Sequence, residues 1–240
     1  MTSLVLLSGW GIDARIWQPL APHWPAGVAV TAPDWPGYGV HFPLAEPQNL
    51  EALAASMVAH LPREAIWVGW SLGALLAVSL LDYLPSPKAV IMLGMGRRFC
   101  SSQGVTLQSL RAFRRAYKRD GQSAWQRFLG WQLEGEPDST HCRQALTRLI
   151  GADTTTLPSA DDGTLMAGLE WLERLDVSRQ VTAPPCPIVT LAGAHDPFLD
   201  ATTRREATAC LPGAGHCPQL SRPEALTEAL VSLAHREVMP

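Results

Sequence analysis

The sequence predicts an α/β fold: a mostly parallel sheet flanked by helices, with an inserted helical segment. Five short runs rich in valine, isoleucine and leucine are bounded by turn residues and occupy residues 4–7, 28–31, 65–68, 89–93 and 188–191. Such continuous apolar runs are typical of strands that are buried on both faces. Helical patterns alternate with these runs at residues 50–60, 72–84 and 223–236. This alternation favours parallel strands joined by helical crossovers.

The alternation stops between residues 99 and 181. Apolar residues there recur at helical spacing in four stretches, residues 107–117, 124–133, 142–150 and 164–175. We therefore expect residues 1–98 and 182–240 to form the α/β core and residues 99–181 to form a helical cap inserted into it. Only twenty residues lead from Asp196 to His216. That length leaves space for a short helix near residues 202–207 and little space for a further strand.

Composition and charge exclude several classes of protein. The chain has 240 residues, 47% of them hydrophobic, and a net charge of −3, which argues against disorder and against a generally basic nucleic-acid-binding protein. No apolar run reaches the roughly 20 residues that a membrane helix needs, and the first residues lack the basic start of a signal peptide. The five cysteines form neither metal-binding pairs nor a disulfide framework. We expect a cytoplasmic monomer with no metal, organic cofactor, membrane or nucleic-acid partner.

The motif Gly69-Trp70-Ser71-Leu72-Gly73 follows a predicted strand and opens a predicted helix. A G-x-S-x-G motif in this context is typical of a nucleophile elbow, in which glycines permit a tight turn that presents the serine at the carboxyl edge of the sheet. The alternative is an ordinary glycine-rich turn, so the prediction depends on the strand–turn–helix context. We predict that Ser71 is a nucleophile.

A serine hydroxyl becomes a good nucleophile only when a base takes its proton. His216 lies in a loop of small residues before the last helix, and we predict that it is this base. Asp196 follows the strand at residues 188–191 and is the candidate for orienting the imidazole, with Asp200 as the alternative. His195 fits the role of base less well, at a strand end beside Asp196. Asp196 could instead only cap a helix.

Acyl transfer also needs N–H donors for the oxyanion that forms in the transition state. The backbone N–H of Leu72, directly after the serine, is one candidate. The backbone N–H of Trp10 is the other, because glycines on both sides of it permit a close approach of the chain. We expect the indoles of Trp10 and Trp70 and the side chain of Cys100 to line the substrate pocket, although simple core packing is an alternative for all three.

Basic residues concentrate in the predicted cap. From Arg97 to Arg148 there are ten basic and four acidic residues, a balance of +6, and the rest of the chain carries nine basic and 18 acidic residues. Charge of this kind steers an acidic partner toward the surface that carries it, although a solvated helix face is the alternative. The densest cluster consists of Arg111, Arg114, Arg115, Lys118 and Arg119.

These motifs resemble the α/β-hydrolase superfamily over nearly the whole chain. The resemblance rests on residues 4–11, the Asp34-Trp35-Pro36-Gly37-Tyr38-Gly39 stretch, the serine motif, the turn at Asp196 and residues 213–218. The chain is more narrowly similar to the pimeloyl-[acyl-carrier protein] methyl ester esterases of biotin synthesis. That similarity rests on residues 9–13 followed by Trp17, on Trp70 beside the serine, and on residues 168–172 with residues 175 and 176.

The resemblance implies a serine carboxylesterase that cleaves the methyl ester of a pimeloyl chain tethered to an acyl-carrier protein. The acyl chain would lie between cap and sheet, and the basic cluster of the cap would meet the acidic helix of the carrier. The alternatives are a general short-chain carboxylesterase, another hydrolase on this scaffold such as a C–C bond hydrolase, and a binding protein that has lost turnover. Ser8 stands where many relatives have histidine, so we expect the support of the Trp10 loop to differ.

Overall fold

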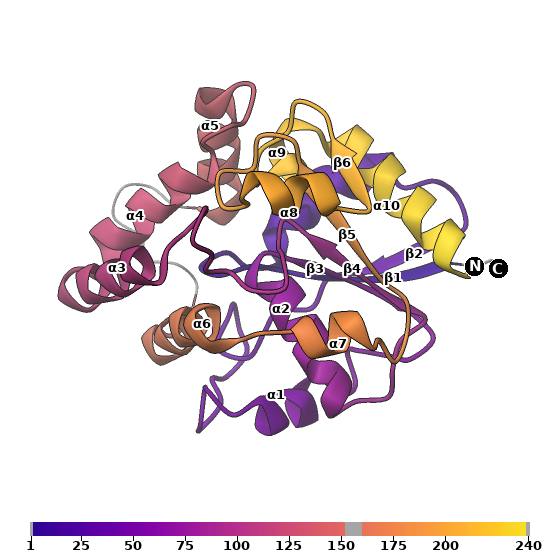
Figure 1. Cartoon of the computed structure of the whole chain (residues 1–240), viewed down its shortest axis with the longest axis horizontal. Coiled ribbons are helices and arrows are strands. Elements are labelled where there is room, and N and C mark those ends of the chain that lie inside the picture. Colours follow the sequence, from indigo (N-terminus) through magenta and orange to yellow (C-terminus); the bar gives the residue numbers. More distant parts are fainter. Residues whose placement is uncertain (1, 152–159, 239–240) are drawn as a thin grey trace.

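A computed structural model describes residues 2–151 and 160–238 and confirms the predicted α/β fold (Figure 1). Six parallel strands form one sheet in the order β2-β1-β3-β4-β5-β6. The strands are β1 (Thr2–Leu7), β2 (Val28–Thr31), β3 (Ile66–Trp70), β4 (Ala89–Leu93), β5 (Ile188–Gly193) and β6 (Ala209–Leu211). All residues of the central strands β3 and β4 are buried, which explains why their sequences are apolar throughout rather than alternating.

The sixth strand corrects one expectation from the sequence. The segment between Asp196 and His216 holds both a helix, α8 (Ala201–Glu206), and the strand β6. Three residues are enough for β6 because it only extends the edge of the sheet, where Gly193 pairs with Leu211. A strand of this length carries too few residues to produce a periodic pattern.

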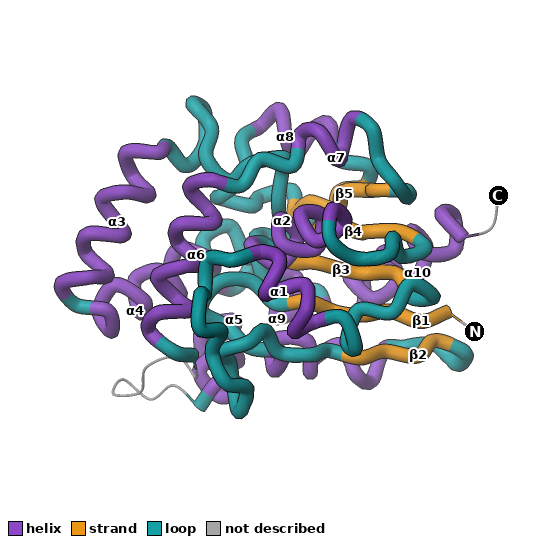
Figure 2. Tube along the Cα trace, turned by 90° about the horizontal axis from the view of Figure 1, so that it is seen from below, coloured by secondary structure: helices purple, strands orange, loops and turns teal. Residues whose placement is uncertain are grey.

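Helices cover both faces of the sheet (Figures 1 and 2). One face carries α1 (Leu50–Met57), α2 (Leu72–Ser79), which the short 3-10 helix η2 (Leu80–Asp82) extends, and α7 (Ser178–Thr182). The other face carries the 3-10 helix η1 (Ala14–His23), α8, α9 (Pro218–Ser221) and α10 (Pro223–Val238). Every residue of α2 is buried, which matches its uniformly apolar sequence. No helix in the described ranges is both long and apolar enough to cross a membrane.

Among the described residues, four further helices lie beyond the carboxyl ends of the strands, and we call them the cap helices (Figure 1). They are α3 (Leu107–Arg119), α4 (Gly121–Gln132), α5 (Ser139–Ile150) and α6 (Asp162–Arg174). Each begins after a Thr or Asp whose side-chain oxygen accepts a backbone N–H of the first turn, and these residues are Thr106, Asp120, Asp138 and Asp161. Such N-caps fix where a helix begins, so α4 and α5 start three residues earlier than the apolar spacing predicted.

The turn from β3 into α2 is packed too tightly for any side chain on its glycines. A Cβ atom on Gly69 would lie 2.5 Å from the Cα atom of Ala74, and a Cβ atom on Gly73 would lie 2.5 Å from the backbone oxygen of Ser8. Both contacts are with backbone, which cannot rotate away. The two glycines of the serine motif are therefore required for the helix to approach the sheet.

We expect Gly69→Ala to lower the free energy of unfolding by about 1–3 kcal/mol, the range typical of overpacking. Urea denaturation measures this change. Gly121→Ala is the matched control, because a Cβ atom there would meet only the Tyr117 ring at 3.4 Å. The control should change the free energy of unfolding by less than about 0.5 kcal/mol. Equal stability of the two variants would contradict the packing argument.

Candidate active site

Ser71 stands at the turn between β3 and α2 in a strained backbone conformation. Its φ is 56° and its ψ is −126°, and it is the only residue other than glycine with a positive φ in the described ranges. Its backbone N–H donates to the oxygen of Leu93 at 2.9 Å. Such a conformation costs about 1–3 kcal/mol and occurs most often at functional sites. The strain therefore marks Ser71 as a candidate functional residue.

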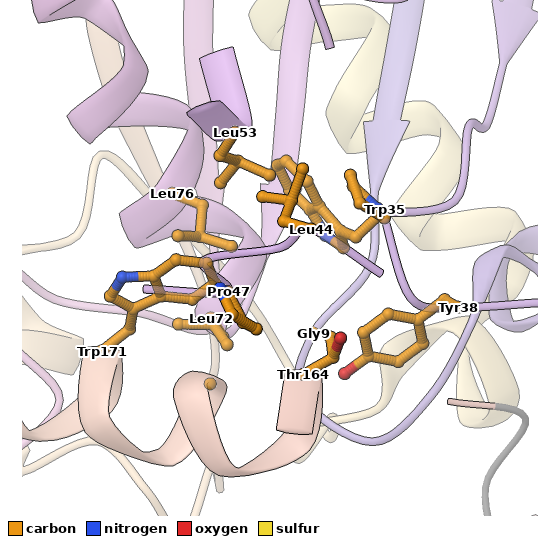
Figure 3. A pocket seen from close by; sticks show the side chains of 12 residues that line it. Gly9, Trp35, Tyr38, Leu44, Pro47, Leu53, Leu72, Leu76, Thr164 and Trp171 are labelled. Atoms are coloured by element: carbon orange, nitrogen blue, oxygen red, sulfur yellow. The ribbon is translucent and has the colours of Figure 1, made fainter. Parts of the chain in front are cut away.

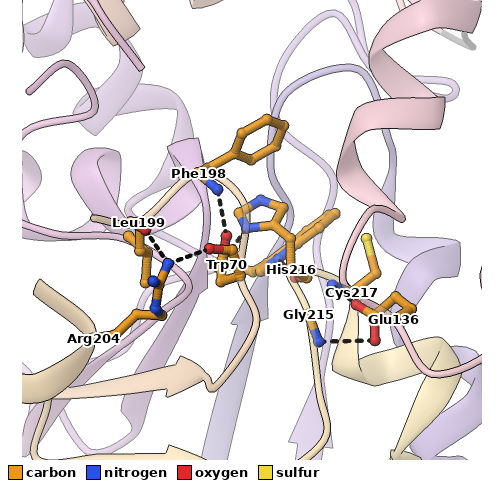
Figure 4. A network of polar contacts seen from close by, with 9 residues as sticks. Trp70, Glu136, Phe198, Leu199, Arg204, Gly215, His216 and Cys217 are labelled. Carbon is orange, nitrogen blue, oxygen red and sulfur yellow. Dashed lines mark hydrogen bonds and ion pairs between the residues drawn. The ribbon is translucent and has the colours of Figure 1, made fainter. Parts of the chain in front are cut away.

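His216 and Asp196 form a fully buried pair (Figure 4). The Nδ1 atom of His216 lies 2.8 Å from Oδ2 of Asp196, and the other carboxylate oxygen accepts the backbone N–H of Phe198 at 2.9 Å. The indole of Trp70 donates to the backbone oxygen of His216 at 2.8 Å. The second ring nitrogen of His216, Nε2, is buried and has no hydrogen-bond partner among the described residues. The imidazole is thus held through one nitrogen while the other is available to take a proton.

The end of β4 connects the serine with this pair. Leu93 accepts the backbone N–H of Ser71, and the next residue, Gly94, lies against His216 and Asp196. A Cβ atom on Gly94 would lie 3.2 Å from Oδ2 of Asp196 and from Nδ1 of His216. The structure therefore gathers Ser71, Asp196 and His216, which are far apart in the chain, around the end of one strand.

The alternatives considered from sequence take other places. The carboxylate of Asp200 accepts the backbone N–H of Thr203 at 2.8 Å and caps α8. His195 has an exposed side chain, and its backbone N–H donates to the oxygen of Ala214 at 2.9 Å. The structure thus brings Asp196, and not Asp200, to His216.

Arg204 of α8 holds the loop that carries Asp196. Its Nη1 atom donates to the backbone oxygen of Asp196 at 2.8 Å and also to that of Leu199 (Figure 4). Both groups are carbonyls, so the guanidinium fixes the course of the loop without pairing with the carboxylate of Asp196. Support for the loop that carries Asp196 therefore comes from α8, in the segment that follows it.

The loop that carries Trp10 lies directly against the serine. A Cβ atom on Gly9 would lie 2.9 Å from Cβ of Ser71, so only glycine permits this approach. The backbone oxygen of Ser8 accepts the indole N–H of Trp35 at 2.9 Å, whereas the buried Ser8 hydroxyl has no hydrogen-bond partner among the described residues. Support for the first half of the loop thus comes from a neighbouring indole rather than from the side chain at position 8.

Two more aromatic residues hold the second half of this loop. The indole of Trp125 in α4 donates to the backbone oxygen of Gly11 at 2.9 Å, and the hydroxyl of Tyr38 accepts the N–H of Gly11 at 3.0 Å. Burial raises the pKa of Tyr38, so the hydroxyl stays neutral. Tyr38 belongs to a stretch that the sequence resemblance includes, whereas nothing in the sequence around Trp125 distinguishes it from a core residue.

The side chains expected to line the pocket lie in three different surroundings. The indole of Trp10 points into the cap and donates to the backbone oxygen of Leu165 at 2.7 Å; its rings lie edge-on to those of Phe113, Tyr117 and Phe128. Trp70 is fully buried beside His216. Cys100 is half-buried and lines a surface hollow together with Leu107 and Glu173.

Two hollows near the site differ greatly in size. The smaller one, about 20 Å³, lies beside Gly9 and Leu72 and is walled by side chains that include Trp35 and Trp171 (Figure 3). It has space for about one water molecule. The larger one, about 390 Å³, lies between α3, α4, α6 and Phe198. Phe198, which lines this hollow, also contacts the ring of His216, with ring centres 4.7 Å apart.

Glu136 is the site residue that sequence reasoning missed most completely. It lies in the turn between α4 and α5, and its side chain is buried. The carboxylate accepts the backbone N–H of Gly215 at 3.0 Å and that of Cys217 at 2.6 Å (Figure 4). An acidic residue in a turn of a charged segment is normally solvated, so no signal in the sequence indicates this position.

Cys217 is next to His216 but is poorly suited to act as a second nucleophile. Burial raises the pKa of its thiol well above the usual value, and the charges of Glu136 and Asp196 add to this effect. The thiol therefore stays protonated. Within residues 2–151 and 160–238, no group of three or more His, Cys, Asp and Glu side chains could hold a metal ion.

The basic cluster of α3 divides into two parts. Arg111 and Arg114 form ion pairs with Glu173 at 2.8 and 2.6 Å, and Arg114 also pairs with Glu170 at 3.2 Å. Arg115, Lys118 and Arg119 are exposed, and the described structure contains no ion pair of theirs. Acidic residues of α6 thus neutralise part of the charge that the sequence count assigned to the cap.

Comparison with known proteins agrees with this arrangement. A model of the Alpha/beta hydrolase family matches residues 4–229. The chain belongs to this family. It is 29% identical to the pimeloyl-[acyl-carrier protein] methyl ester esterase of Vibrio atlanticus (strain LGP32), over 97% of this chain and 94% of the relative. It is 30% identical to the enzyme of that name from Edwardsiella ictaluri (strain 93-146), over 96% and 92%. The predicted resemblance is confirmed.

Solved structures show the same fold at lower identity. An esterase (EaEST) from Exiguobacterium antarcticum superposes with a TM-score of 0.77 at 18% identity, over 98% of this chain and 92% of that one. A thermophilic esterase from Thermogutta terrifontis gives a TM-score of 0.75 at 19% identity, over 100% and 91%. At this level of identity the likeness concerns the fold alone.

We expect Trp125→Phe to lower the free energy of unfolding by about 1–3 kcal/mol, because the buried oxygen of Gly11 loses its donor. It should also lower the rate of ester hydrolysis, because the Trp10 loop loses a support. Trp17→Phe is the matched control, because the indole nitrogen of Trp17 is buried without a hydrogen-bond partner in the described structure. Urea denaturation and an ester assay on both variants provide the measurement. A larger loss in the control would contradict the role given to the indole N–H.

Proposed function

We propose that this chain is a serine carboxylesterase that hydrolyses the methyl ester of a pimeloyl chain carried by an acyl-carrier protein. The observation that carries the proposal is the buried His216–Asp196 pair, whose free ring nitrogen lies in the same site as the strained Ser71. Near full-length similarity to relatives named pimeloyl-[acyl-carrier protein] methyl ester esterase supports the choice of substrate. A cytoplasmic location belongs to the proposal and is supported by five cysteines that are all free.

The first half of the reaction forms an acyl-enzyme. Ser71 Oγ attacks the ester carbonyl while Nε2 of His216 takes the hydroxyl proton, and Asp196 stabilises the imidazolium through Nδ1. The backbone N–H groups of Trp10 and Leu72 donate to the oxyanion. When the tetrahedral intermediate collapses, His216 returns the proton to the methoxy oxygen and methanol leaves.

The second half of the reaction releases the acid. His216 takes a proton from a water molecule that attacks the acyl-enzyme carbonyl, and the same N–H groups hold the new oxyanion. Collapse of this intermediate breaks the bond to Ser71 Oγ, which regains the proton from His216. The products are the free carboxyl group on the carrier-bound chain and the regenerated serine. His216 thus acts as base and then as acid in each half.

The larger hollow is the proposed place of the acyl chain and of the arm that tethers it. Its size of about 390 Å³ is within the range of small-molecule sites, and aromatic and aliphatic side chains of the cap dominate its lining. The smaller hollow, at about 20 Å³, is too small for a seven-carbon chain. Phe198 lines the larger hollow and contacts the ring of His216, so the ester reaches Ser71 past this ring.

We further propose that α3 receives the carrier. Its exposed basic residues Arg115, Lys118 and Arg119 lie on a helix that also walls the larger hollow, so a carrier bound there would place its arm at the hollow. Arg111 and Arg114 can contribute to carrier binding only if they exchange the carboxylates of α6 for those of the carrier. This internal neutralisation favours the second candidate function, a general short-chain carboxylesterase that needs no carrier.

Ser71→Ala should lower kcat for p-nitrophenyl butyrate by about 10³-fold or more, the loss expected when a triad member is removed. Ser79→Ala is the matched control, because Ser79 is a buried serine at the far end of the same helix α2. The control should keep wild-type kcat. Activity of wild type no higher than that of Ser71→Ala would sink the esterase proposal and favour a binding protein with a hydrolase fold.

Replacing Arg115 and Arg119 together by alanine should lower kcat/KM for methyl pimeloyl-carrier protein by about 5- to 10-fold at low salt, because steering by charge is lost. The effect should shrink at high salt and be absent for p-nitrophenyl butyrate. Arg63→Ala with Lys88→Ala is the matched control, because these exposed cations precede β3 and β4 at the end of the sheet away from the cap. Equal kcat/KM for carrier-bound and small methyl esters would favour the general esterase instead.

A further inference from the structure

Glu136 is a buried carboxylate whose environment contains N–H and O–H donors instead of a cation. Its side chain is 7% exposed, and no lysine, arginine or histidine forms an ion pair with it among the described residues. Its donors are the N–H groups of Gly215 and Cys217 and the hydroxyl of Ser221, which is 2.5 Å away. A buried carboxylate is costly unless hydrogen bonds compensate it, and such charge-assisted bonds are among the strongest in proteins.

All three donors lie outside the cap helices, in the segment that carries His216. Gly215 and Cys217 are the residues on either side of the histidine, and the backbone oxygen of His216 itself is held by Trp70. A Cβ atom on Gly215 would lie 2.7 Å from Oε1 of Glu136, so glycine is required there. Backbone groups of three consecutive residues are thus fixed, which leaves the imidazole little freedom to shift.

The neighbouring residue in the same turn lies against the loop that carries Asp196, the other residue of the pair. Gly135 has a φ of 85°, and a Cβ atom on it would lie 2.1 Å from the backbone oxygen of His195. His195 directly precedes Asp196. The turn between α4 and α5 therefore contacts both the loop that carries Asp196 and the loop that carries His216.

We propose that Glu136 is a positioning residue that holds the catalytic histidine from the cap. The inference rests on the proposed triad and extends it, since it makes the geometry of His216 depend on a turn about eighty residues away in sequence. An error of about 1 Å in the position of a catalytic group can cost 10²-fold in rate. By accepting hydrogen bonds from both neighbours of His216, Glu136 therefore affects turnover. It does not act on ester binding, because Glu136 faces the backbone of the histidine loop rather than the larger hollow.

The test is Glu136→Gln, which keeps the size of the side chain but turns one acceptor oxygen into an NH₂ group facing an N–H donor. We expect kcat for p-nitrophenyl butyrate to fall by about 10- to 100-fold, while KM changes by less than about 3-fold. The downfield proton resonance of the His216–Asp196 hydrogen bond should shift or broaden. Glu136→Asp keeps the charge, serves where the glutamine variant does not fold, and should also lose kcat because the shorter side chain cannot reach both N–H groups.

Asp138→Asn is the matched control for this test. It removes one negative charge two residues further along the connection between α4 and α5. Asparagine still caps α5, because its side-chain oxygen accepts the backbone N–H of His141 as that of Asp138 does. Its kcat should stay within 2-fold of wild type. An unchanged kcat in folded Glu136→Gln, or an equal loss in Asp138→Asn, would overturn the inference. Ser71→Ala in the same assay separates the two proposals, since activity in that variant would refute the triad itself.

Discussion

The hydrogen bond between His216 and Asp196 is the interaction on which the surrounding structure depends. Both side chains are fully buried, so a charge that forms on the imidazole has no water to stabilise it and needs the carboxylate. The carboxylate in turn uses its second oxygen to accept the N–H of Phe198. Gly94 leaves space for the pair, and Arg204 fixes the loop on the acid side. Together these contacts hold one buried polar pair in place.

Indole N–H groups support the loops of the site, and three of the nine tryptophans of the chain act in this way. Trp35, Trp70 and Trp125 each donate to a backbone oxygen in a loop of the site. An indole fills apolar space and satisfies a carbonyl with a single donor. It can therefore hold a loop from within the core, where a charged donor would be costly to bury. In the Trp10 loop, the indoles of Trp35 and Trp125 provide support that the side chain of Ser8 does not give.

The cap helices are part of the site as well as its cover. Trp125 of α4 supports the Trp10 loop, the indole of Trp10 lies among aromatic rings of α3 and α4, and the turn after α4 contacts the loops of the acid and the histidine. A cap bound in this way cannot move far without disturbing the groups beneath it. Its outer face remains free to carry the charges that would meet a partner. Support of the site and the proposed docking of the carrier thus involve different parts of the cap helices.

Sequence alone determined the parallel sheet, because strands buried on both faces are apolar throughout. It also indicated Ser71, because a tight strand-to-helix turn needs glycines. Asp196 and His216 were indicated because one follows a predicted strand and the other lies in a loop of small residues before the last helix. It did not reveal β6, which is too short for periodicity, nor the pairing of Arg111 and Arg114 with α6, because ion pairs between helices depend on how the helices pack. Only the tertiary structure decided that Asp196 rather than Asp200 meets His216, and that Glu136 is buried against backbone N–H groups. A local sequence pattern indicates which residues are buried. The partner of a buried polar group depends on chain segments that meet only in the folded protein.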